Sequence, residues 1–120
     1  MNTASNPLLS PWPGPYGLPP FDTIRAEHIE PALHEAMLVH RQEIAALASQ
    51  EAAPRFDNTV AAFDRAGRLL RSVLTVFDHL SASVATPELQ AVERNIVGPR
   101  SAHFSAIHTD AAFFARLDAL

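Results

Sequence analysis

The sequence predicts an all-α fold: an up-down-up bundle of three long helices plus a short fourth, preceded by an extended Pro-rich N-terminal arm. Apolar residues recur at steps of three and four over most of residues 23–120, which is the spacing of one face of a helix. No segment alternates in the manner of a half-buried strand. With 48% hydrophobic and 18% charged residues among 120, the composition is typical of a globular domain.

The first segment, residues 1–22, is expected to be an arm rather than a helix. Residues 1–20 carry six of the ten prolines and no charged side chain, and proline both removes a backbone donor and restricts the residue before it. A proline-rich ligand for a signalling module is the alternative, but the P-x-x-P spacing of such ligands does not occur. Packing of the arm on another surface is favoured by its apolar residues, namely Leu8, Leu9, Trp12, Tyr16, Leu18 and Phe21.

The first long helix is expected to begin near Pro31, after a short turn at residues 24–28, because proline fits the first helical turn. It continues towards Gln50. Its apolar residues form a heptad-like seam, which consists of Ile29, Leu33, Met37, His40, Ile44 and Leu47.

A loop at residues 51–58 leads to the second helix, residues 58–84, with Asp57 or Asn58 as its cap. One stripe of this helix is apolar or small: Val60, Phe63, Gly67, Leu70, Leu74, Phe77, Ser81 and Val84. The opposite stripe is polar until it meets Ala82: Asp64, Arg68, Arg71, Thr75 and Asp78. The two stripes predict a continuous amphipathic helix.

The third helix is expected from Pro87 to about His108, with Thr86 as its cap. Gly98 and Pro99 should kink it, because Pro99 interrupts the hydrogen-bond ladder. A short last helix follows, capped by Asp110.

The periodicity also predicts which residues are buried and which are left exposed. We expect Gly67 to allow a close approach between the first two helices, with five residues buried between them: Met37, Ile44, Leu70, Leu74 and Phe77. Six apolar residues lie off the seams: Leu38, Val39, Leu69, Val73, Val76 and Leu80. A three-helix bundle should not bury all of these together with Trp12 and Tyr16 of the arm, so we expect self-association, most simply as a homodimer.

The stretch "HEAML", residues 34–38, looks like the zinc-protease signature H-E-x-x-H without its last histidine. The next histidine, His40, lies about 120° around a helix from His34, so the two cannot chelate one ion as an i, i+4 pair can. We interpret the resemblance as a coincidence, with His40 facing the core and His34 the surface.

The other polar residues suggest no active site. The spacings of His28, His79, His103 and His108 provide no convergent metal ligands, although a site assembled across helices stays open. The carboxylates show no acid/base pair that the sequence could establish; they include Glu27, Glu30, Glu35, Asp64 and Asp78. We therefore predict no catalytic, cofactor-binding or metal-binding residue.

The sequence has one basic cluster, which consists of Arg65, Arg68 and Arg71 at steps of three residues and follows Asp64. Because Asp64 precedes Arg68 by four positions, we interpret it as a solvated, ion-paired face rather than a phosphate or nucleic-acid site. The net charge of −4 also gives no reason to expect nucleic acid or an acidic membrane as a partner.

The chain contains no cysteine, which excludes disulfides and thiolate chemistry. The sequence shows no signal peptide and no run of about 20 apolar residues, the length that a membrane helix needs. We therefore expect a cytoplasmic protein.

Three stretches resemble the oligopeptidase A and thimet oligopeptidase family of zinc metallopeptidases. They are "PYGLPPFDTIRAEHIEPAL", "EIAALASQEAAPRFDNTVAAFDRAGRLL" and "TPELQAVERNI". The W-x-x-P-[FY]-G-x-P-P-F-D form, from Trp12 to Asp22, is most similar to the bacterial peptidyl-dipeptidase branch, and the likeness extends from Asn6 to Leu120.

The resemblance implies that residues 23–120 are a helical bundle forming the N-terminal fragment of a larger all-α peptidase. Such an enzyme releases dipeptides from the C-termini of short peptides, and its zinc ligands lie beyond residue 120. The fragment alone would be inactive and would help to wall the substrate channel, with the remainder of the parent enzyme as its partner. A free-standing interaction module is the alternative; the end of the chain inside a capped helix favours the peptidase.

Overall fold

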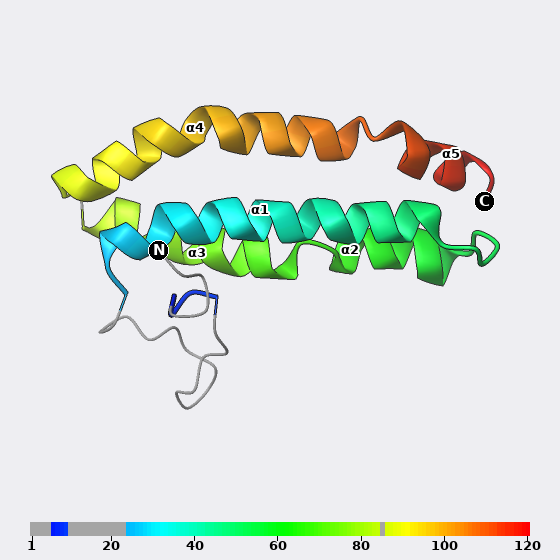
Figure 1. Cartoon of the computed structure of the whole chain (residues 1–120), viewed down its shortest axis with the longest axis horizontal. Helices are drawn as coiled ribbons and strands as arrows, with labels where there is room; N and C mark the ends of the chain where they lie inside the picture. The colour runs from blue at the N-terminus through cyan, green and yellow to red at the C-terminus, as the bar shows by residue number, and fades with distance from the viewer. Residues whose placement is uncertain (1–5, 10–23, 85) are drawn as a thin grey trace.

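The computed structural model describes residues 6–9, 24–84 and 86–120, and the all-α class is confirmed for these residues. The helices are α1 (Ala26–Ser49), η3 (Asp57–Ala61, a π-type turn), α2 (Ala62–Arg65), α3 (Arg68–Ser83), α4 (Pro87–His108) and α5 (Ala111–Asp118). Helix α1 lies between α4 and α5 on one side and the α2–α3 pair on the other, with successive long segments running in opposite directions (Figure 1).

Most of the N-terminal arm lies outside the described residues. The residues outside include Trp12, Tyr16, Leu18 and Phe21. Residues 6–9 form a turn, with the Leu9 amide donating to the Asn6 carbonyl at 3.0 Å, so this part is not extended. The Asn6 amide nitrogen donates to the carbonyl of His28 at 2.8 Å. Leu8 is 1% exposed, so this short stretch is packed on the helices.

Helix α1 begins earlier than expected, and the predicted turn at residues 24–28 was wrong. The backbone amide of Arg25 donates to the Nδ1 of His28 at 2.9 Å, which satisfies a group that a helix start leaves without a partner. Pro31 therefore lies inside the helix rather than in its first turn. The predicted seam is confirmed, because all six of its residues are buried.

The predicted continuous helix over residues 58–84 was also wrong, because the chain breaks at Gly67. Gly67 has φ 81°, a left-handed conformation that suits glycine. Neither Asp57 nor Asn58 precedes the first helical turn as its cap. Asn58 acts instead from within that turn, where its Oδ1 accepts from the Arg55 amide at 2.8 Å.

The predicted N-terminal caps of α4 and α5 are confirmed. The Thr86 hydroxyl accepts from the Leu89 amide at 3.2 Å, and the Asp110 Oδ1 accepts from the Phe113 amide at 2.8 Å. Pro99 lies within α4, and the ribbon of α4 bends along its length (Figure 1).

Two apolar clusters form the core. The first joins Leu8, the N-terminal half of α1, α3 and the first half of α4; the second joins the C-terminal end of α1, α2, the end of α4, and α5. The five predicted core residues are all buried. Val73 and Val76, two of the six apolar residues off the predicted seams, are 0% and 2% exposed, because they belong to the first cluster together with Leu8.

Buried Arg116 of α5 lies against the C-terminal end of α1. Its Nη1 donates to the Gln50 carbonyl at 3.4 Å, while the last turn of α1 contains no basic residue of its own. A cation at the C-terminal end of a helix interacts favourably with the helix dipole, so Arg116 helps to hold α5 on α1.

Candidate functional site

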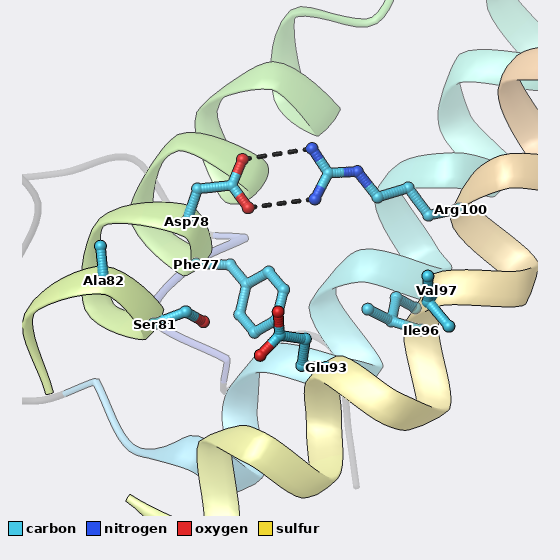
Figure 2. A pocket seen from close by; sticks show the side chains of 8 residues that line it. All are labelled: Phe77, Asp78, Ser81, Ala82, Glu93, Ile96, Val97 and Arg100. Carbon is cyan, nitrogen blue, oxygen red and sulfur yellow. Dashed lines mark hydrogen bonds and ion pairs between the residues drawn. The ribbon is translucent and has the colours of Figure 1, made fainter. Parts of the chain in front are cut away.

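The groove between α3 and α4 is the first candidate site. Each helix contributes residues from successive turns, and the residues of α3 face those of α4 across a groove of about 340 Å³. Figure 2 shows the eight side chains that line the groove: Phe77, Asp78, Ser81 and Ala82 from α3, and Glu93, Ile96, Val97 and Arg100 from α4.

An ion pair closes one end of this groove. The Arg100 guanidinium donates to both carboxylate oxygens of Asp78, at 3.0 and 3.1 Å (Figure 2). The two side chains are 37% and 54% exposed, so the pair contributes little stability despite its bidentate geometry. The pair joins α4 to α3 at this position.

The rest of the groove combines apolar side chains with two polar groups. Val97 is 64% exposed, and the Ser81 Oγ is buried without a hydrogen-bond partner among the described residues. A serine nucleophile needs a base within hydrogen-bond reach, which Ser81 lacks here. The groove therefore presents apolar side chains, the Ser81 hydroxyl and the Asp78–Arg100 pair.

A second candidate is a buried pair of histidines between α1 and α4. The His40 Nδ1 lies 2.9 Å from the His103 Nε2, and the two rings are 6% and 3% exposed. The Arg41 Nη1 lies 3.5 Å from the His103 Nδ1. The Phe104 ring stands edge-on to His103, with 5.1 Å between the centroids.

Burial keeps both rings uncharged at neutral pH. It lowers the pKa of His103 to about 4, with further lowering by His40 and Arg41. Burial also lowers the pKa of His40; the carboxylate of Glu43 opposes this effect, and Arg71 and His108 add to it. A neutral imidazole has one donor and one acceptor nitrogen, so the pair can form a directed hydrogen bond.

A cavity of about 130 Å³ adjoins this pair at the break in the second helical segment. Its lining comes from α1, α2, α3 and α4, so four helices meet there. The lining residues are His40, Phe63, Asp64, Ala66, Arg71, Phe104, Ile107 and His108.

A wider groove of about 620 Å³ lies where the N-terminal ends of α1 and α4 meet, and it is mainly acidic. Glu27, Glu30 and Glu88 line it together with Arg25. No hydrogen bond joins these carboxylates in the part of the chain described here.

Of the two histidines at and near the "HEAML" stretch, His34 lies at the surface and His40 in the core, as expected. The side chain of His34 is 53% exposed and its Nε2 lies 3.9 Å from Glu30, whereas His40 is buried. The zinc that the family resemblance implies needs about four converging ligands. Within residues 6–9, 24–84 and 86–120, no three His, Asp or Glu side chains form a group that could hold a metal ion, so these residues do not fit zinc.

The basic cluster is exposed as expected, but its predicted ion pairing was wrong. The break at Gly67 places Asp64 and Arg68 on separate helices, so they are no longer one turn apart on a common helix. Arg71 instead donates to the Ala66 carbonyl at 3.0 Å and to the Arg65 carbonyl at 3.5 Å. The cluster thus satisfies carbonyls at the end of α2.

Sequence reasoning missed both cross-helix polar contacts. Asp78 and Arg100 are 22 positions apart, and His40 and His103 are 63 apart. Helical periodicity relates only residues three or four positions apart, so it does not predict these contacts. A hint for the second pair was present, because His40 lies within an otherwise apolar seam.

Comparison with known proteins gives two informative similarities. A dipeptidyl carboxypeptidase of Salmonella typhimurium is 37% identical over 117 residues, and one of Escherichia coli K12 is 36% identical over 118 residues. Each match covers 98% of this chain but 17% of the relative's length. No protein-family model matches the chain.

None of the helices in the described ranges is long and apolar enough to cross a membrane. The sequence similarity confirms the peptidyl-dipeptidase resemblance seen in the motifs. The chain is therefore similar to two dipeptidyl carboxypeptidases over 98% of its own length, and it spans 17% of theirs.

Proposed function

We propose that this chain is the N-terminal helical portion of a cytoplasmic zinc metallopeptidase that releases dipeptides from the C-termini of short peptides. The observation that carries the proposal is 37% identity across 98% of the chain to a dipeptidyl carboxypeptidase. An identity spread over the whole chain favours a common fold and a common place in the enzyme over a shared short motif.

In this proposal the chain is structural and the zinc chemistry belongs to another part of the enzyme. The helices would form part of the wall of the substrate channel. The α3–α4 groove supports this role, because it offers apolar side chains and the Asp78–Arg100 pair for contact but no activated nucleophile. The remainder of the enzyme would be the chain's partner.

The test is to read the coding sequence downstream of residue 120 and to assay the product of the whole reading frame. We expect an H-E-x-x-H motif there, and release of dipeptides from N-acetylated peptides by mass spectrometry, abolished by a zinc chelator. A reading frame without the motif, or a product that leaves such peptides intact, would refute the proposal and favour a free-standing interaction module.

A further inference from the structure

The His40–His103 pair lies between the two apolar clusters of the molecule. On α1, Met37 belongs to the first cluster and Ile44 to the second. On α4, Ile96 belongs to the first and Ile107 to the second. The two histidines occupy the interval on both helices, next to Phe104, which packs against the first cluster, so a buried hydrogen bond lies between the two clusters.

The order of donors along this contact can be assigned from its neighbours. Arg41 can only donate, so the His103 Nδ1, at 3.5 Å, is the acceptor. The His103 Nε2 then carries its proton and donates to the His40 Nδ1 at 2.9 Å. The His40 proton is left on Nε2. The chain of hydrogen bonds therefore accommodates two ring protons.

A third proton has no favourable place in this chain. On His103 it would sit on Nδ1 and face the Arg41 donor. On His40 it would sit on Nδ1 and face the His103 Nε2–H, unless the His103 proton moved to Nδ1 and met Arg41 instead. Each arrangement sets two donors against each other and adds a charge beside a guanidinium, in a site where desolvation already disfavours charge.

We propose that His40 and His103 form a pH-sensitive latch that holds α1 and α4 together between the two apolar clusters and opens when a ring is protonated. Gly67 places the break between α2 and α3 directly against the His40 ring, because a Cβ built on Gly67 would lie 2.8 Å from the His40 Nε2. Movement of His40 would therefore also reach the second helical segment.

The charged and titratable groups around the latch favour the neutral, closed form on balance. Arg41 and Arg71 repel a protonated ring, as does a protonated His108, whereas the carboxylate of Glu43 attracts one. That carboxylate also accepts from the Gly67 amide at 3.2 Å, and Asp64 lines the adjoining cavity. These groups come from every helix that packs against the pair.

The direction of the pH effect follows from the lowered pKa values of the two rings. Below the ordinary histidine pKa of 6.5 the unfolded or opened chain binds more protons than the closed chain. The latch therefore stabilises the fold fully above pH 6.5, and this contribution is lost as the pH falls towards about 4.

The first test needs no substitution. Nitrogen-15 NMR of the histidine rings in the 120-residue chain should show His40 and His103 neutral at pH 7, both with the proton on Nε2. A predominant imidazolium at either residue at pH 7 in the folded chain, or a proton on the His40 Nδ1, would overturn the proposal.

The second test uses His103→Gln, which keeps a donor and an acceptor but does not titrate, and the exposed histidine variant His34→Gln as its control. Between pH 6.5 and about 4, the urea midpoint of the parent should fall with pH. Removal of one of the two linked groups should make that fall smaller in His103→Gln, whereas His34→Gln should match the parent. If a folded His103→Gln chain showed the same decrease of the urea midpoint with pH as the parent, the latch would be contradicted.

The third test measures opening directly. The chain has no cysteine, so spin labels can be placed at two introduced cysteines, Gln42→Cys on α1 and Ala106→Cys on α4, both exposed positions. The distance distribution should widen between neutral pH and about pH 4 with His103 present and stay narrow with His103→Gln. An unchanged distribution with His103 present would overturn the proposal.

Discussion

The backbone of Gly67 rests against the ring of His40, on a neighbouring helix. A Cβ built at Gly67 would lie 2.8 to 3.0 Å from three ring atoms of His40. Distances under 3.0 Å are closer than real Cβ contacts, and the φ of 81° independently disfavours a side chain. The residue type at position 67 is therefore required both by conformation and by packing.

Gly67→Ala should destabilise the chain. The left-handed conformation alone costs a non-glycine residue about 1–2 kcal/mol, and the contact with His40 adds to this. Urea unfolding at neutral pH measures the change.

Gly98→Ala is the matched control. No atom lies within 4 Å of the corresponding Cβ, and alanine gains about 0.5–1 kcal/mol over glycine in a helix. The restriction on a residue before proline offsets part of this gain, so the control should stay close to the parent. Equal losses in the two variants would contradict the assigned role of Gly67.

Leu74→Ala should cost about 2–5 kcal/mol of unfolding free energy, as large-to-small core substitutions do. Leu74 is 7% exposed and lies in the first cluster. Leu38→Ala is the control, because Leu38 is 41% exposed on α1. A loss at Leu74 below about 0.5 kcal/mol, the range of ordinary surface changes, would place it outside the core.

The Asp78–Arg100 pair should contribute about 0.2–1 kcal/mol, the range measured for exposed ion pairs. A double-mutant cycle with Asp78→Asn and Arg100→Gln isolates this coupling, which should shrink as salt is added. A coupling several times larger, or one that salt leaves unchanged, would mean that the pair is effectively desolvated.

Self-association as a homodimer stays a prediction, but fewer exposed apolar residues now support it. Val73 and Val76 no longer support it, because they are buried. Exposed apolar side chains remain on three helices: Leu38 at 41%, Val97 at 64% and Phe114 at 45%. Light scattering over a concentration series should reveal dimers; a mass of 13.0 kDa at every concentration would show a monomer.

The features that the sequence predicted correctly depend on nearby residues. The caps Thr86 and Asp110 bond amides three positions ahead, and the seam of α1 follows from helical periodicity alone. The start of α1 was misplaced because a histidine, His28, supplied the acceptor at its N-terminal end, and Pro31 then had to be accommodated inside the helix.

The break at Gly67 and the histidine pair could not be predicted because they depend on tertiary contacts. Gly67 fits a helical stripe by spacing, and its left-handed conformation is linked to the position of the His40 ring. His40 finds its hydrogen-bond partner 63 positions away. Local patterns do not contain this information.

The most direct test of the proposed role is the zinc content of residues 1–120 beside that of the product of the whole reading frame. Both would be dialysed against a weak chelator, re-exposed to zinc, washed and analysed for metal, and the same samples would be offered an N-acetylated peptide. We expect the longer product to retain one zinc per chain and release dipeptides, and residues 1–120 to do neither. One tightly held zinc in residues 1–120, or dipeptide release by them alone, would contradict the assignment of this chain as a structural part of the peptidase.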